Sequence, residues 1–113
     1  MDALLGWDRE ALQRFRDALA HDPALAVAHA GAALCLFLDE RFEEARAAAA
    51  EARRAAAGQT PRERSHVEAL ARLVTGDTRG AEEVMREHLA AWPRDLVIAQ
   101  RLYFVWFWQG RFP

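Results

Sequence analysis

The chain has 113 residues and a formal net charge of −2, which leaves room for one domain with one modest core. Alanine supplies 25 of the 59 apolar residues and only ten residues are β-branched, so we expect an all-α fold of closely approaching helices. The mild acidity argues against nucleic acid as a partner, no apolar run reaches the ~18 residues that span a membrane, and the single cysteine excludes an intrachain disulfide.

The N-terminus carries acidic residues where a secretory signal needs basic ones, so we expect a cytoplasmic protein. All 15 basic residues are arginine, and neither lysine nor asparagine occurs. This bias is typical of a GC-rich coding sequence, from which we expect a bacterial source.

Helix signals divide the first half of the chain into three helices. Asp8 precedes an amphipathic run that ends before the turn at Pro23. A second run covers residues 24–38 and stops at a polar turn. A third covers residues 42–57, where Gly58 is expected to close the helix.

The second half predicts three more helices. Residues 60–63 form a capping box with proline at the first helical position, so a helix begins there and ends at Gly76. A fifth helix is expected over residues 78–91, and Asp95 caps a sixth that runs to about Gln109. We therefore expect six antiparallel helices joined by short turns.

An internal repeat runs through these helices. Ala11, Ala45 and Ala81 follow one another at intervals of 34 and 36 residues, and Gly76 and Gly110 are again 34 residues apart. We therefore divide one domain, residues 1–113, into a half repeat at 8–23, full repeats at 24–58 and 61–93, and a half repeat at 95–113.

The period, together with the spacing of Ala11, Phe15 and Pro23, resembles the tetratricopeptide repeat. The resemblance is carried by the second helix of each pair. The first helix departs from it, because His29, for example, stands where tryptophan is usual. The resemblance implies antiparallel helix pairs stacked as a right-handed solenoid, with the first helix of each pair along a concave, partner-binding face.

Longer stretches are similar to the tetratricopeptide repeat protein 38-like family. They are Ala-His-Asp-Pro at 20–23, Thr-Pro-Arg-Glu-Arg-Ser-His-Val-Glu-Ala-Leu at 60–70, Gly-Asp at 76–77 and Trp-Pro-Arg-Asp at 92–95. Members of that family are longer helical-repeat proteins without an assigned reaction. The likeness therefore implies a fragment of a longer protein, and it supplies no catalytic residue.

Residues that could carry chemistry do not form a recognised motif. No pair of the four histidines has the spacing of a zinc site, so we expect no metal and no cofactor. Ser65 and His66 are adjacent, but neighbours on a helix point about 100° apart, so they do not form a nucleophile and its base. Cys35 lies in an apolar run and is expected to be a buried, unreactive thiol.

The first helices of the pairs predict a partner-binding groove that is mainly apolar. An apolar helix or segment is the partner that such a wall favours. The predicted groove residues are Val27, Ala30, Leu34, Phe37, Leu38, Glu63, His66, Leu70, Leu73, Phe104, Phe107 and Trp108. Alternatively, missing parts of a parent chain cover this surface, or Arg62, Arg64 and Arg72 hold an acidic peptide.

These observations predict a scaffold that mediates protein–protein interaction and has no catalysis of its own. One alternative is a structural fragment of a longer enzyme whose active site lies outside this chain. Another is the sensory half of a transcription regulator, whose DNA-binding domain would likewise lie outside it. None of the three requires a membrane or nucleic acid at this chain.

The C-terminal segment predicts self-association. Residues 102–108 are seven consecutive large apolar residues, and such a run covers every side of a helix. A terminal repeat normally needs a polar outer face, so we expect a homodimer through these helices. The residues expected at the contact are Leu102, Tyr103, Trp106, Phe107, Trp108 and Phe112.

Light scattering after size exclusion tests this prediction. We expect a dimer at micromolar concentration, and Trp106→Glu should shift it toward monomer or precipitate the protein, because a charge would enter a desolvated contact. A monodisperse 12.8 kDa monomer in the absence of detergent would contradict the prediction.

Overall fold

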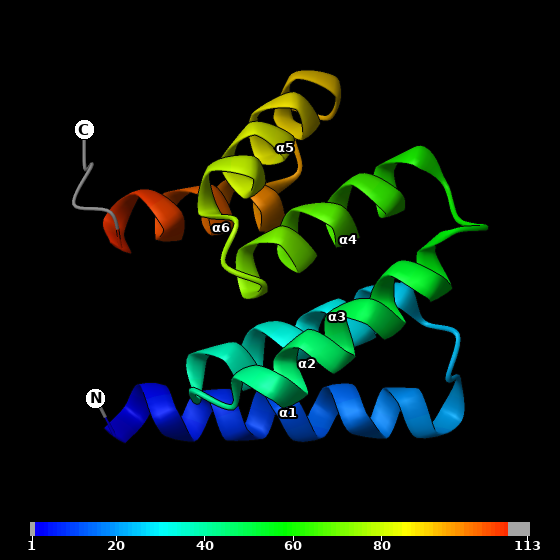
Figure 1. Cartoon of the computed structure of the whole chain (residues 1–113), viewed down its shortest axis with the longest axis vertical. Coiled ribbons are helices and arrows are strands. Elements are labelled where there is room, and N and C mark those ends of the chain that lie inside the picture. Colours follow the sequence, from blue (N-terminus) through cyan, green and yellow to red (C-terminus); the bar gives the residue numbers. More distant parts are fainter. Residues whose placement is uncertain (1, 109–113) are drawn as a thin grey trace.

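The computed structural model describes residues 2–108, with side-chain surroundings for residues 10–102. This part of the chain is all-α with six helices, as expected (Figure 1). They are α1 (Asp2–His21), α2 (Ala26–Leu38), α3 (Phe42–Ala56), α4 (Pro61–Val74), α5 (Thr78–Ala91) and α6 (Leu96–Trp108). None of these described helices is long and apolar enough to cross a membrane.

Two helix starts differ from the prediction. α1 begins at Asp2 rather than near Asp8, because Asp2 supplies an acidic start and Ala3, Leu4 and Leu5 after it are good helix formers. α2 begins at Ala26, two residues later than predicted, because the Asp22 side chain accepts a hydrogen bond from the Ala24 N–H (3.0 Å). That bond holds residues 22–25 in a turn.

The helix boundaries repeat along the chain. α1, α3 and α5 end at residues 21, 56 and 91, and α2, α4 and α6 begin at residues 26, 61 and 96. Both series advance by 35 residues, so all three turns between them have the same length. The helix boundaries therefore recur at nearly the same interval as the repeated alanines of the sequence.

The turns that follow α2 and α4 are also built alike. Glu40 and Gly76 are the second residues of these turns, and both have positive φ (61° and 91°). The next N–H in each turn bonds back to the helix, Arg41 to the Leu36 carbonyl and Asp77 to the Arg72 carbonyl, both at 2.9 Å. Each turn is thus a Schellman motif, and Gly76 meets its left-handed conformation without the steric cost of a side chain.

The predicted N-caps of α4 and α6 are confirmed. Thr60 Oγ1 accepts a hydrogen bond from the Glu63 N–H (3.2 Å), and Asp95 Oδ1 accepts one from the Ile98 N–H (3.4 Å). The Glu63 carboxylate makes no return bond to the start of α4 in the described part of the chain. The capping box is therefore half formed, and this carboxylate stays available.

Small residues bring the helices close together. α2 packs against α1, α3 and α4, and nine of its 13 residues are buried, including Cys35 as expected. Its Gly31 leaves room for the Phe15 ring of α1, which a Cβ at that position would overlap. The buried stripe of α3 consists of Ala45, Ala49, Ala52 and Ala56.

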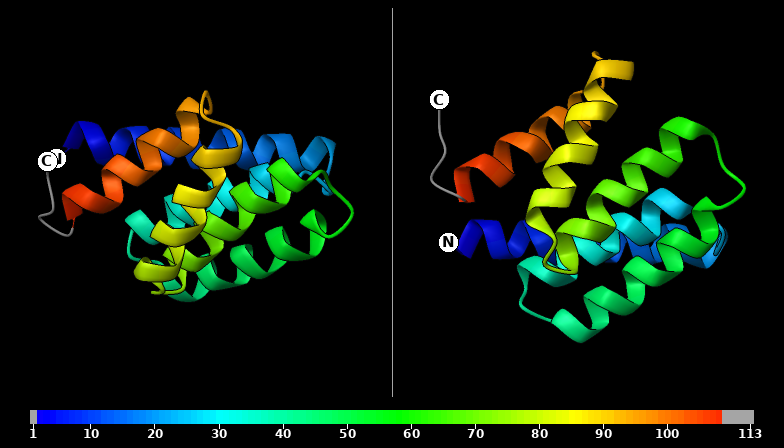
Figure 2. Two further views of the ribbon diagram at one scale, coloured as in Figure 1. Left: turned by 90° about the horizontal axis from the view of Figure 1, so that it is seen from above. Right: turned by 45° about the horizontal axis from the view of Figure 1, so that its top comes forward.

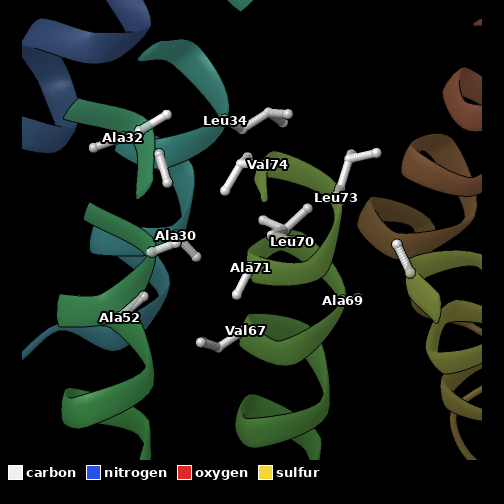
Figure 3. Packing of buried hydrophobic residues seen from close by; sticks show 14 of the residues in the cluster. Ala30, Ala32, Leu34, Ala52, Val67, Ala69, Leu70, Ala71, Leu73 and Val74 are labelled. Carbon is white, nitrogen blue, oxygen red and sulfur yellow. The ribbon is translucent and has the colours of Figure 1, made fainter. Parts of the chain in front are cut away.

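α4 joins the two halves of the structure. Figure 3 shows Val67 and Val74 of α4 directed toward α2 and α3, and both valines are almost fully buried. On its other side α4 packs against α5, which in turn packs against α6. Figure 2 shows this last pair crossing at the end of the chain. α2, α4 and α6 begin near one another, and the site described below lies at these three helix starts.

Of the three repeated alanines, Ala45 and Ala81 are fully buried, and Ala11 is half-buried against the core. We expect Ala81→Leu to lower the melting temperature, because overpacking a dense contact costs about 1–3 kcal/mol. Ala90→Leu is the matched control, since Ala90 is exposed on the same helix. Equal melting curves for the two variants, followed by circular dichroism, would contradict the packing.

Candidate partner-binding site

Four of the predicted groove residues lie in the core. Ala30 and Leu70 are 1% exposed, and Leu34 and Leu73 are 5% exposed. Their burial follows from the packing of α2 against α4, which closes the wall that they were expected to form. A partner can reach almost none of their surface in this structure.

The other predicted groove residues divide into three groups. Phe37 and Leu38 are half-buried and pack against the core. Val27, Glu63 and His66 line a surface pocket. Phe104, Phe107 and Trp108 lie outside the side chains that the structure describes, as do Tyr103 and Trp106 of the predicted dimer contact, and Phe112 lies outside the described residues. Leu102, also predicted at that contact, is 6% exposed, because it packs into the core of its own chain.

The pocket lies where α2, α4 and α6 begin and has a volume of about 380 Å³. We call it the valine pocket; it is lined by Val27, Thr60, Arg62, Glu63, His66, Asp95 and Val97. Val27, Arg62 and Val97 are each the second residue of their helix. The 35-residue repeat thus places one valine on each side of an arginine.

Asp95 connects the three elements around this pocket. Its Oδ2 lies 3.3 Å from Arg62 Nε of α4 and 2.7 Å from His88 Nε2 of α5, while its Oδ1 caps α6. Burial raises the pKa of Asp95, but the hydrogen bonds from His88, the Ile98 N–H and Arg62 outweigh it, and the pKa falls below its ordinary value. The carboxylate is therefore charged, and each of its oxygens accepts at least one hydrogen bond.

His88 is the buried centre of this network. It is 1% exposed, its Nδ1 lies 2.8 Å from Ser65 Oγ, and its ring lies 4.8 Å from that of Trp92 at a tilt of 50°. In the neutral ring, Nε2–H donates to Asp95, so Nδ1 accepts a hydrogen bond from the Ser65 hydroxyl. Both ring nitrogens are satisfied, which is what a buried histidine requires.

Ser65, His88 and Asp95 thus form a hydrogen-bonded series of the residue types found in serine hydrolases. The sequence motifs gave no sign of it. Ser65, however, is the fifth residue of α4, where backbone N–H groups already bond within the helix, and it lines neither described pocket. Acyl transfer needs a cavity at the nucleophile and free donors for the oxyanion, so this geometry fits a structural network better.

His66 faces the valine pocket beside this network. Its ring is half-buried and lies 6.4 Å from the His88 ring in an edge-to-face arrangement. Burial lowers the pKa of His66 below its usual value, although the charge of Asp95 opposes the shift. At neutral pH His66 is therefore an uncharged part of the pocket wall.

A second pocket, of about 350 Å³, lies on the other side of the Arg62–Asp95 pair. We call it the tryptophan pocket; it is lined by Arg62, Ala91, Trp92, Pro93, Arg94 and Asp95. Arg94 makes no ion pair within the described residues. In the same part of the chain, no group of three or more His, Cys, Asp or Glu side chains is placed to hold a metal ion.

Comparison of the chain with protein-family models, curated proteins and solved structures finds no match. The resemblance to tetratricopeptide repeats therefore stays a prediction.

The repeat carried a signal for the buried histidine that motif searching missed. A shift of 36 residues aligns Ala45, Ala49 and Ala52 of α3 with Ala81, Met85 and His88 of α5. All six are buried. The alignment alone could have shown that His88 points inward and needs partners.

We expect His88→Phe to lower the free energy of unfolding by about 3 kcal/mol. This is the upper end of the cost of losing a hydrogen bond to a charged group, because the neutral His88 ring donates to the Asp95 carboxylate and also bonds Ser65. Ser65→Ala, the control, should cost about 1 kcal/mol, since it removes one hydrogen bond of a half-buried side chain. Urea unfolding measures both, and equal losses would show that the His88–Asp95 bond does not stabilise the fold.

Proposed function

We propose that this chain is a non-catalytic, tetratricopeptide-like interaction module of the cytoplasm. It binds a segment of a partner protein at the valine pocket. The observation that carries the proposal is the pocket itself, which has an open apolar side chain at each end, Val27 (39% exposed) and Val97 (45% exposed).

The distribution of exposed apolar side chains supports this location. Among the described residues, five large hydrophobic side chains are exposed: Leu25, Val27, Phe42, Leu96 and Val97. All except Phe42 lie at the starts of α2 and α6, next to or within the pocket. Apolar surface concentrated around a hollow with a polar floor is typical of a recognition site.

The polar groups support binding rather than catalysis. The Asp95 oxygens and both nitrogens of His88 are occupied by hydrogen bonds within the chain. These groups hold the pocket in shape, and their hydrogen bonds within the chain fit a structural role. A pocket whose walls are fixed before binding loses less conformational entropy when a partner docks.

Selection from a phage-displayed random peptide library tests the proposal. Peptides selected on the wild-type chain should bind about tenfold more weakly to the double variant Val27→Ser, Val97→Ser, because their apolar contacts in the pocket are lost. The matched control is Leu25→Ser, Leu96→Ser, which removes two exposed leucines that precede the two valines by two residues and one residue and do not line the pocket.

Comparing the two double variants distinguishes binding in the pocket from binding to any exposed apolar surface. A library that yields no binding peptide, or equal losses for both double variants, would overturn the proposed site. Turnover of an activated ester that is lost on His66→Ala would overturn the non-catalytic assignment.

A further inference from the structure

We infer that the valine pocket accepts a basic side chain, lysine or arginine, of the partner segment. The aliphatic part of that side chain lies between Val27 and Val97, and its charge pairs with Glu63. This inference rests on the proposed function and specifies the chemistry of the partner.

One carboxylate that lines the pocket, that of Glu63, has no side-chain cation beside it; it lies in the first turn of α4, where the helix N-terminus stabilises its charge. Arg62 and Asp95 form an ion pair, and His66 is neutral at physiological pH. Glu63 is half-buried and makes no ion pair or side-chain hydrogen bond with any described residue. Arg64, the next arginine on α4, donates instead to the Gln59 carbonyl (2.6 Å) and does not line the pocket.

The valines complement the stem of a basic residue. Lysine and arginine bury their methylene groups along apolar surface while the charged end reaches a polar partner. Val27 and Val97 come from different helices and offer such a surface, and Glu63 on α4 supplies the anion in the same pocket. A purely apolar side chain would leave the Glu63 carboxylate partly desolvated and unpaired, which is unfavourable.

An acidic side chain fits the same pocket poorly. It would meet Glu63, while the positive charge of Arg62 is already balanced by Asp95, to which its Nε donates. The neighbouring tryptophan pocket has the opposite balance, because Arg94 there has no ion pair within the described residues. The two pockets therefore differ in the charge that they favour, and the valine pocket is the one that favours a cation.

Nuclear magnetic resonance titration of the full chain with short peptides tests the inference. The probes are acetyl-alanyl-lysyl-alaninamide and its norleucyl and glutamyl counterparts, and the signals followed are the methyl groups of Val27 and Val97. The lysyl probe should shift both valines and bind about threefold or more tightly than the norleucyl probe, the gain expected of a partly exposed ion pair. The preference should weaken as salt is added.

Glu63→Gln should reduce the affinity for the lysyl probe to that for the norleucyl probe. Glu43→Gln is the matched control, because Glu43 also lies in the first turn of a helix, has no ion pair among the described residues and is remote from the pocket lining. It removes the same charge and should leave the lysine preference intact.

Four results would overturn the inference. Equal binding of the lysyl and norleucyl probes, stronger binding of the glutamyl probe, no shift of the valine signals, or an unchanged lysine preference in Glu63→Gln would each do so. Library peptides that lack basic residues and still bind less well to the Val27→Ser, Val97→Ser variant would contradict the basic partner while sustaining the proposed function. A library without any binder would contradict the proposed function itself.

Discussion

The carboxylate of Asp95 is the group on which the C-terminal half of the structure depends. It caps α6, accepts a hydrogen bond from the buried His88 of α5 and pairs with Arg62 of α4. One side chain therefore fixes the relative positions of three helices at the place where both pockets form. Because the carboxylate is 6% exposed, losing any one of these partners leaves a charge that water cannot readily solvate.

The N-terminal half is held together by a different constraint, the small size of alanine. Four alanines form the buried stripe of α3, and α2 lies enclosed among three helices. Each alanine contributes little burial of its own, but it lets backbones approach closely and loses no side-chain entropy on folding. The two halves thus combine packing of small residues with one buried polar network, and α4 belongs to both.

Much of this fold could be predicted from the sequence, because its signals are local. The Thr60 cap, the proline after it and Gly76 mark the limits of α4 within two residues. The high alanine content indicates the all-α fold class. The start of α1 was predicted too late, because a capping residue inside a run of good helix formers does not end the helix. Local signals predict where helices begin and end, but they predict less well which side of each helix is buried by its neighbours.

The site was harder to predict for that reason. The expected groove placed Leu34 and Leu70 on an open wall, whereas the approach of α2 and α4 buries them. Val27, Glu63 and His66 line a surface pocket, because they lie near helix starts, where the packed helices separate. The pairing of His88 with Asp95 depends on the α5–α6 turn, whose geometry no short motif encodes.

The valine pocket shows how divergence within a repeat can create a binding site. Val27, Arg62 and Val97 occupy the same position in three successive first helices, so three valines there would form a continuous apolar strip. The arginine interrupts that strip and needs an anion, which Asp95 of the following turn supplies. Once that pair has formed, Glu63 on the next residue has no cation left within the described chain, and its charge stays between two valines. The polarity of the pocket therefore follows from one departure from the repeat and from the number of charges available to balance it.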